Sequence, residues 1–138
     1  MTLTPYVNFA GHCAEAFRFY EQHLGGRIGM MMTHGESPVP SRLDPTWKDK
    51  VLHATMTVAG TELQGADIPD AEPMRSAYLT LAVDSDSEAE RIHAALADGG
   101  TVFMRMQETF FASRFAQLRD RFGINWVIMH RRAMPSGA

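Results

Sequence analysis

The sequence predicts an α+β fold built from two tandem β-α-β-β-β modules. The main observation is an internal repeat, in which residues 6–30 (YVNFAGHCAEAFRFYEQHLGGRIGM) are similar to residues 78–104 (YLTLAVDSDSEAERIHAALADGGTVFM). Each copy reads as a strand, a helix, a pair of glycines and a second strand, and a loop and a hairpin pattern follow. We therefore expect a single pseudo-symmetric domain, residues 1–138, whose two sheets wrap a shared cavity.

Hydrophobic periodicity assigns the elements of the first module, about residues 3–67. Residues 3–10 alternate like a strand, and residues 12–24 carry apolar side chains at helical spacing. Gly25-Gly26 is expected to end this helix, because glycine adopts the left-handed C-cap conformation without steric cost. The remaining expected elements are a strand, a long proline-containing loop and two further strands: 27–34, 35–49, 50–58 and 61–67.

A polar linker, residues 68–75, leads into the second module, about residues 76–130. Ser85 followed by Glu88 is a capping-box pattern, which predicts the start of a helix over 86–98. The other expected elements are four strands and one loop: 77–83, 101–106, 114–119 and 124–130, with the loop at 107–113. The last residues, 131–138, are expected to form a flexible tail.

Alternation along the strands separates an apolar face from a mixed polar face. We expect the apolar faces to pack against the helices, as in the strand that contains Leu52 and Ala54. The opposite faces carry Tyr6, His53 and Tyr78, which are large groups suited to a ligand-lining surface. A solvent-exposed sheet face shows the same alternation, so that alternative stays open here.

Composition and charge describe an ordinary globular chain. Of the 138 residues, 45% are hydrophobic and 21% are charged, and the net charge is −3, which favours neither a nucleic-acid nor a membrane partner. No apolar run approaches the roughly 18 residues that span a bilayer. The single cysteine, Cys13, has no internal disulfide partner, which predicts a cytoplasmic protein.

Three stretches also carry a resemblance to a known family: TPYVNFAGHCAEAFRFYEQHLGG, DPTWKDKVLHATMTVAGTELQGAD and QETFFASRFAQLRDRFGINW. They are similar to the PhnB-like family of the glyoxalase/bleomycin-resistance/dioxygenase group, also called the vicinal oxygen chelate superfamily. The resemblance runs from Thr4 to about His130. It implies paired β-α-β-β-β modules, whose curved mixed sheets form a cup, and a homodimer. The chain departs from the family pattern at Gln64, Phe111 and Arg121, which affects the pocket and not the fold.

Proteins of this family are sometimes labelled 3-demethylubiquinone methyltransferases, an activity that the residues do not support. A methyltransferase of the usual kind holds its cofactor at a glycine-rich turn between a strand and a helix of a doubly wound sheet. Here Gly25-Gly26 and Gly99-Gly100 follow predicted helices, where they serve as caps.

Metal-dependent members of the superfamily bind one divalent ion through His and Glu side chains from four strands, and the ion acts as a Lewis acid. The resemblance places the following residues at the ligand positions: Tyr6, Asn8, Glu62, Gln64, Tyr78, Thr80, and Trp126 with its neighbours Asn125, Val127 and Ile128. Only Glu62 is a strong ligand, and His53 is the residue expected to join it. Because first-row metals need three or more such ligands, we expect no metal cofactor, with one divalent ion as the alternative.

The candidate ligand-binding residues are polar or aromatic side chains expected at the cup: Tyr6, Asn8, His53, Thr55, Gln64, Tyr78, Glu108 and Arg114. His53 leads this set, and its alternative role is a strand histidine bonded to a neighbour. For Glu108 and Arg114, the alternative is a structural role that includes an ion pair with each other. No catalytic residue is assigned, since Cys13 lies on an apolar helix stripe and no Ser-His-acid arrangement follows from the spacing.

We therefore expect a cytoplasmic homodimer that binds a small organic molecule, of the drug-sequestering kind found among bleomycin-resistance relatives. Two alternatives remain open at this stage. One is a metal-dependent lyase, isomerase or dioxygenase of the same superfamily, and the other is a non-catalytic structural or regulatory dimer. Catalysis itself is left undecided by the sequence.

Overall fold

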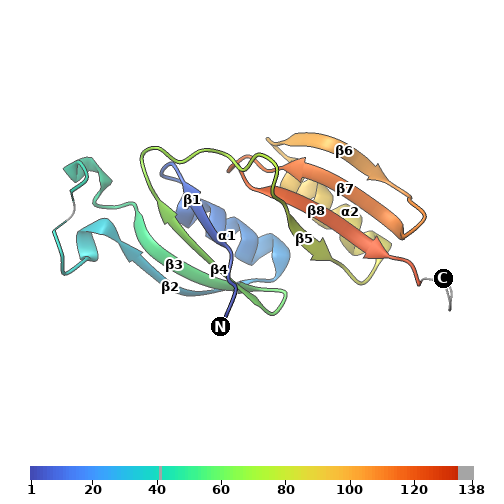
Figure 1. Ribbon diagram of the computed structural model, residues 1–138, viewed down its shortest axis with the longest axis horizontal. Coiled ribbons are helices and arrows are strands. Elements are labelled where there is room, and N and C mark those ends of the chain that lie inside the picture. Colours follow the sequence, from blue (N-terminus) through green and yellow to red (C-terminus); the bar gives the residue numbers. More distant parts are fainter. Residues whose placement is uncertain (41, 134–138) are drawn as a thin grey trace. The chain divides into compact units, whose positions relative to one another are not determined.

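The computed structural model describes residues 1–40 and 42–133, and it confirms the predicted fold class. The chain divides into two compact units, Met1–Glu72 and Pro73–Ala138. Each unit holds one four-stranded mixed sheet and one long helix in the order of a β-α-β-β-β module (Figure 1). Within the described ranges, no helix has the length and apolar character needed to cross a membrane.

The two units share one topology. The first contains β1 (Tyr6–Phe9), α1 (Cys13–Leu24), β2 (Arg27–Thr33), β3 (Val51–Val58) and β4 (Thr61–Asp67), with short 3₁₀ turns at His34–Glu36 and Pro45–Trp47. The second contains β5 (Leu79–Ala82), α2 (Asp86–Ala97), β6 (Thr101–Gln107), β7 (Ala112–Arg119) and β8 (Asn125–Arg131). The strand orders, β1-β4-β3-β2 and β5-β8-β7-β6, correspond one to one, and in each the first pair is parallel. This correspondence agrees with the repeat seen in the sequence.

Each helix packs against one face of its own sheet and leaves the other face open. In the first unit, Phe9, Phe17 and Tyr20 are almost fully buried between α1 and the sheet. Gly65 lies under Phe17, and a Cβ atom there would come within 2.8 Å of the Phe17 ring. The helix ends at Gly25, whose φ of 68° is the predicted left-handed C-cap.

The two helices begin in different ways. In α2, the Ser85 hydroxyl accepts a hydrogen bond from Glu88 N at 3.0 Å, as the capping pattern predicts. In α1, the N-cap residue makes no side-chain cap, and Asp67 from the end of β4 supplies the acceptor instead. Its Oδ1 accepts from Gly11 N (3.0 Å) and Cys13 N (2.9 Å), and its Oδ2 accepts from Val51 N (2.9 Å). One buried carboxylate therefore joins the start of α1 to both β3 and β4.

One prediction about the strand faces is wrong. Strand alternation predicts Leu52 on the apolar face, but Val51 is buried there instead, with 1% of its surface exposed. The pairing of β2 with β3 skips Leu52, since Met32 is opposite His53 and Thr33 is opposite Val51. This bulge turns Leu52 away from the core. In the predicted flexible tail, Arg131 belongs to β8, and residues 134–138 lie outside the described part of the chain.

Candidate functional site

The open face of the first sheet brings together five of the residues predicted to bind a ligand. Strand pairing places Tyr6 beside Gln64, and Gln64 beside Thr55, so these three form one row across β1, β4 and β3. Asn8, two residues after Tyr6, and His53, two residues before Thr55, lie on the same face. We call these five residues the open-face set. The buried Val7 and Phe9 alternate with Tyr6 and Asn8, which confirms that the set faces away from α1.

Tyr6 and His53 form the centre of the open-face set. Their rings stack with centroids 5.8 Å apart and an interplanar angle of 25°. The Tyr6 hydroxyl lies 3.5 Å from His53 Nδ1. Because the two residues come from β1 and β3, which flank β4, the rings meet above β4. Tyr6 remains 48% exposed, so the stack presents an aromatic surface that a molecule can reach.

The phenol of Tyr6 is a neutral hydrogen-bond donor. Burial raises the pKa of Tyr6, and the charge of Cys13 adds to the effect in the same direction. Next to it, Gln64 Nε2 donates a hydrogen bond to Glu62 Oε2 at 2.8 Å. That contact leaves the carbonyl oxygen of the Gln64 amide as an acceptor. The open-face set therefore combines a stacking surface with both a donor and an acceptor.

The residues at the superfamily's metal-ligand positions do not fit a resident ion. Glu62 is opposite Thr57, so His53 lies four residues away along β3, roughly 13 Å at the usual rise of a strand. In the second unit, Val127 pairs with Thr80 and faces the open side without a donor atom. Among the described residues, no three His, Cys, Asp or Glu side chains gather as ligands for one ion. That the protein functions without a metal cofactor remains a prediction.

Tyr78, from the second unit, belongs to an apolar cluster. It packs with Phe111 and Phe115 against the buried Ala112, Val127 and Met129. Its ring also meets the Phe103 ring edge to face, at a centroid distance of 6.5 Å. Tyr78 is thus part of an apolar cluster within its own unit. Its predicted convergence with the open-face set of the first unit remains a prediction.

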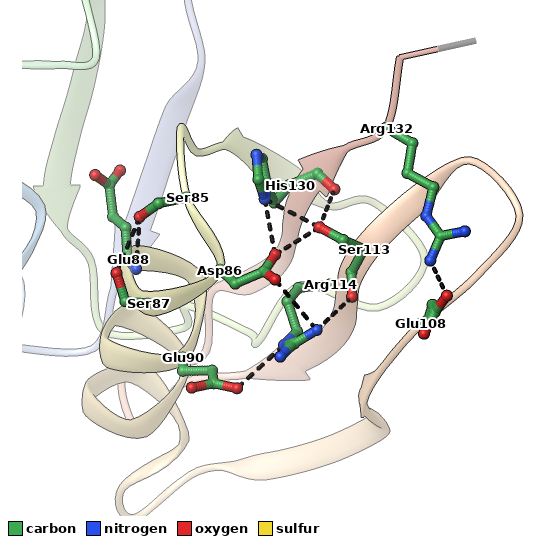
Figure 2. A network of polar contacts seen from close by, with 10 residues as sticks. All are labelled: Ser85, Asp86, Ser87, Glu88, Glu90, Glu108, Ser113, Arg114, His130 and Arg132. Atoms are coloured by element: carbon green, nitrogen blue, oxygen red, sulfur yellow. Dashed lines mark hydrogen bonds and ion pairs between the residues drawn. The ribbon is translucent and has the colours of Figure 1, made fainter. Parts of the chain in front are cut away.

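The ion pair considered between Glu108 and Arg114 is wrong. Arg114 Nε lies 3.1 Å from Glu90 Oε1, and its Nη1 lies 3.5 Å from Asp86 Oδ2 (Figure 2). Glu108 pairs with Arg132 instead. Arg114 is therefore bound to α2, on the helix side of β7, where the helix carboxylates already neutralise its charge.

A polar cluster that the sequence analysis missed lies at the start of α2. Ser113 Oγ is 2.5 Å from Asp86 Oδ1 and 3.0 Å from His130 Nδ1, and His130 Nδ1 is 2.8 Å from Asp86 Oδ1 (Figure 2). Hydrogen bonds from Ser113 and then His130, with a smaller effect of the Arg114 charge, lower the pKa of Asp86. Both partners reach the same nitrogen of His130, so the cluster is no Ser-His-acid relay, which needs both ring nitrogens. It joins β7 and β8 to α2.

The loop after β2 surrounds two adjoining hollows. Backbone hydrogen bonds from His34 N to Lys50 O and from Gly35 N to Lys48 O, both 2.8 Å, close its base. The hollows have volumes of about 390 and 240 Å³. Their shared lining is the segment from His34 to Pro40, represented by His34, Ser37, Val39 and Pro40. The three prolines between 35 and 49 predicted a long loop here, but not its shape.

Comparison with known proteins gives a consistent result. A family model described as 3-demethylubiquinone-9 3-methyltransferase matches residues 1–129. Protein YjdN of Escherichia coli (strain K12) is 32% identical over 149 residues, which cover 99% of both chains. Among solved structures, protein PA1353 from Pseudomonas aeruginosa is 40% identical, covers 96% of this chain and 99% of its own, and has a TM-score of 0.85.

More distant structures show the fold alone. A PhnB protein from Bacillus cereus has a TM-score of 0.79 at 22% identity, covering 94% of this chain and 99% of its own. Structures described as a glyoxalase or as a glyoxylase/bleomycin resistance protein/dioxygenase domain share the fold at 16% and 17% identity. The chain therefore belongs to the family described as 3-demethylubiquinone-9 3-methyltransferase, a PhnB-like family with the fold of the glyoxalase/bleomycin-resistance/dioxygenase superfamily.

Proposed function

We propose that this protein binds a small, flat, uncharged organic molecule on the open-face set, and that it does so without a resident metal. The observation that carries the proposal is the stacked pair of Tyr6 and His53, which remains accessible above β4. A flat ligand that extends this stack gains offset aromatic contact, worth about 0.5–1.5 kcal/mol beyond its buried area.

The hydrogen-bonding groups around the stack favour a neutral ligand. Tyr6 supplies a donor, Gln64 supplies an acceptor, and the hydroxyl of Thr55 can serve as either. None of the open-face set carries a fixed charge. An ionic ligand bound here would lose water without gaining a compensating charge, which is costly. Apolar area with a few neutral polar groups is the usual character of a small-molecule site.

The backbone supports binding rather than methyl transfer of the usual kind. Gly25, with φ of 68°, is the C-cap of α1, as predicted. Gly99, with φ of 73°, also follows a helix, but the C-cap of α2 is Asp98 and not the predicted glycine. A nucleotide-like cofactor is held by glycines that precede a helix, at the carboxyl edge of a doubly wound parallel sheet. Each sheet here has one parallel pair and two antiparallel pairs, so neither provides that edge.

A thermal-shift screen with a set of small, flat, uncharged aromatic fragments tests the proposal. Compounds that bind the native protein raise its melting temperature. Replacing Tyr6 by leucine should weaken any such compound about threefold to tenfold, in line with the loss of one stacking contact. The matched control is Phe110→Leu, which removes an 81% exposed aromatic ring from the second unit and should leave affinity unchanged.

Two results would contradict the proposal. One is a compound whose affinity is the same in Tyr6→Leu, His53→Leu and the wild type, since the site would then lie elsewhere. The other is a stoichiometric transition metal in protein purified without chelators, together with compound binding that disappears when the metal is removed. Light scattering at micromolar concentration tests the homodimer predicted from the sequence separately, and a monomer mass would reject it.

A further inference from the structure

We infer that the described parts of the loop between β2 and β3, residues 34–40 and 42–50, form a second binding site, which accepts a small carboxylate with an apolar body. The site is separate from the open-face set and involves none of its residues. Three features support it: a preorganised loop with hollows inside it, an apolar wall, and two cations that have no partner among the described residues.

The loop is held in shape by its own polar groups. At its start, Thr33 and Glu36 form a reciprocal capping box, with Thr33 N to Glu36 Oε1 at 3.0 Å and Glu36 N to Thr33 Oγ1 at 3.3 Å. Farther on, Asp44 Oδ1 accepts from both the N and the Oγ1 of Thr46 at 2.9 Å. These contacts lower the pKa of both Glu36 and Asp44, so the two carboxylates are ionised and already bonded at neutral pH.

Apolar side chains form one wall of the hollows. Val39 is 68% exposed, and Pro40 lines both hollows beside it. The bulge in β3 is what adds Leu52 to the lining of the larger hollow. Bulges re-aim side chains in this way and are frequent next to functional sites. The volume of about 390 Å³ lies at the lower end of the range for small-molecule pockets, which begins near 300 Å³.

The charged groups of the lining favour an anion. Arg42 lines the larger hollow and Lys48 the smaller one. Among the described residues, neither side chain has a hydrogen bond or ion pair. The carboxylate of Glu36 accepts hydrogen bonds from Thr33, and that of Asp44, which lines the smaller hollow beside Lys48, accepts them from Thr46. The remaining carboxylate of the loop, Asp49, does not line either hollow. Two unpaired cations beside an apolar wall are suited to a carboxylate that carries a hydrocarbon group.

One lining residue, Ser37, can donate a directional hydrogen bond, whereas the donor nitrogen of His34 is already engaged. His34 Nε2 lies 3.2 Å from the carbonyl oxygen of Asp67, and because a carbonyl oxygen only accepts, this nitrogen is the donor. Ser37 Oγ accepts a hydrogen bond from Val39 N at 3.1 Å, which leaves its hydroxyl proton free to donate. Ser37 can therefore donate to the same carboxylate that Arg42 and Lys48 attract.

An NMR titration of the ¹⁵N-labelled full chain with benzoate and with octanoate tests the inference. We expect saturable shifts of the amides of Gly35, Ser37 and Lys48, and no comparable shifts in β5 to β8. Arg42→Gln and Lys48→Gln should each weaken binding about tenfold, as expected for the loss of one charge-assisted contact. Arg105→Gln is the matched control, since it removes one exposed positive charge from β6 and should leave affinity unchanged.

Inorganic phosphate and Leu52→Asn test the apolar wall. Phosphate should bind at least about tenfold more weakly than octanoate, because it gains nothing from the wall. Leu52→Asn should weaken octanoate, with an unchanged melting temperature as evidence that the fold is intact. Any of three results would overturn the inference. The loop amides do not shift, phosphate and octanoate bind equally well, or Arg105→Gln weakens carboxylate binding as much as Arg42→Gln does. Tyr6→Leu should not affect carboxylate binding, so failure here is distinguishable from failure at the open-face set.

Discussion

Replacing Asp67 by asparagine should destabilise the first unit far more than its chemical similarity suggests. Asp67 is 1% exposed, and its two oxygens accept three backbone hydrogen bonds, from Gly11, Cys13 and Val51. An asparagine amide keeps one oxygen but turns an NH₂ group toward the remaining backbone N–H. One hydrogen bond is lost and two donors face each other, a change that costs about 2–3 kcal/mol.

Urea unfolding measured by circular dichroism gives the loss of free energy, and hydrogen exchange locates it. In Asp67→Asn, the protection of the Val51 amide against hydrogen exchange should fall. The favoured orientation of the asparagine side chain places its NH₂ group, and no acceptor, opposite that amide. Asp70→Asn is the matched control. This residue is exposed, and its substitution should change the free energy of unfolding by less than about 0.5 kcal/mol. If both variants unfold at the same urea concentration as the wild type, the role assigned to Asp67 is refuted.

Three further predictions concern buried groups. Burial lowers the pKa of His93 below 6.5, so the unfolded chain binds this proton more tightly. The free energy of unfolding should therefore fall as the pH drops through about 6.5, and urea titrations at several pH values should show a flatter slope for His93→Leu. Burial, with a smaller contribution from the Asp67 charge, raises the pKa of Cys13 to about 12. Ellman's reagent at pH 8 should therefore label the thiol only after the protein is unfolded in urea. Gly65→Ala should cost about 1–3 kcal/mol in urea unfolding, because its Cβ meets the Phe17 ring; unchanged stability would show that the ring moves freely.

The sequence predicts the elements well because local signals define them. Apolar spacing and the glycine pair specify α1, and its observed bounds, Cys13–Leu24, differ from 12–24 by one residue. Strand alternation also places Tyr6 and His53 on the open face, where the structure brings their rings together. Alternation fails at Leu52, since a bulge shifts the period and no residue in the strand announces it.

Contacts between distant residues could not be predicted from the sequence. Asp67 reaches Cys13 across 54 positions, and Asp86 reaches His130 across 44. Neither pair has a characteristic spacing, because each depends on how strand ends and helix starts meet in the folded unit. The partner of Glu108 was missed for the same reason: Arg132 follows the end of β8, while the sequence only suggested the nearer Arg114.

The most direct test of the central claim is an NMR measurement of the Tyr6 and His53 ring signals during titration with a compound found in the thermal-shift screen. If the open-face set is the binding surface, both ring signals should shift together and saturate at the dissociation constant measured by calorimetry. The ring signals of Phe110 should stay in place. Ring signals of Tyr6 and His53 that do not move while the compound binds would contradict the account.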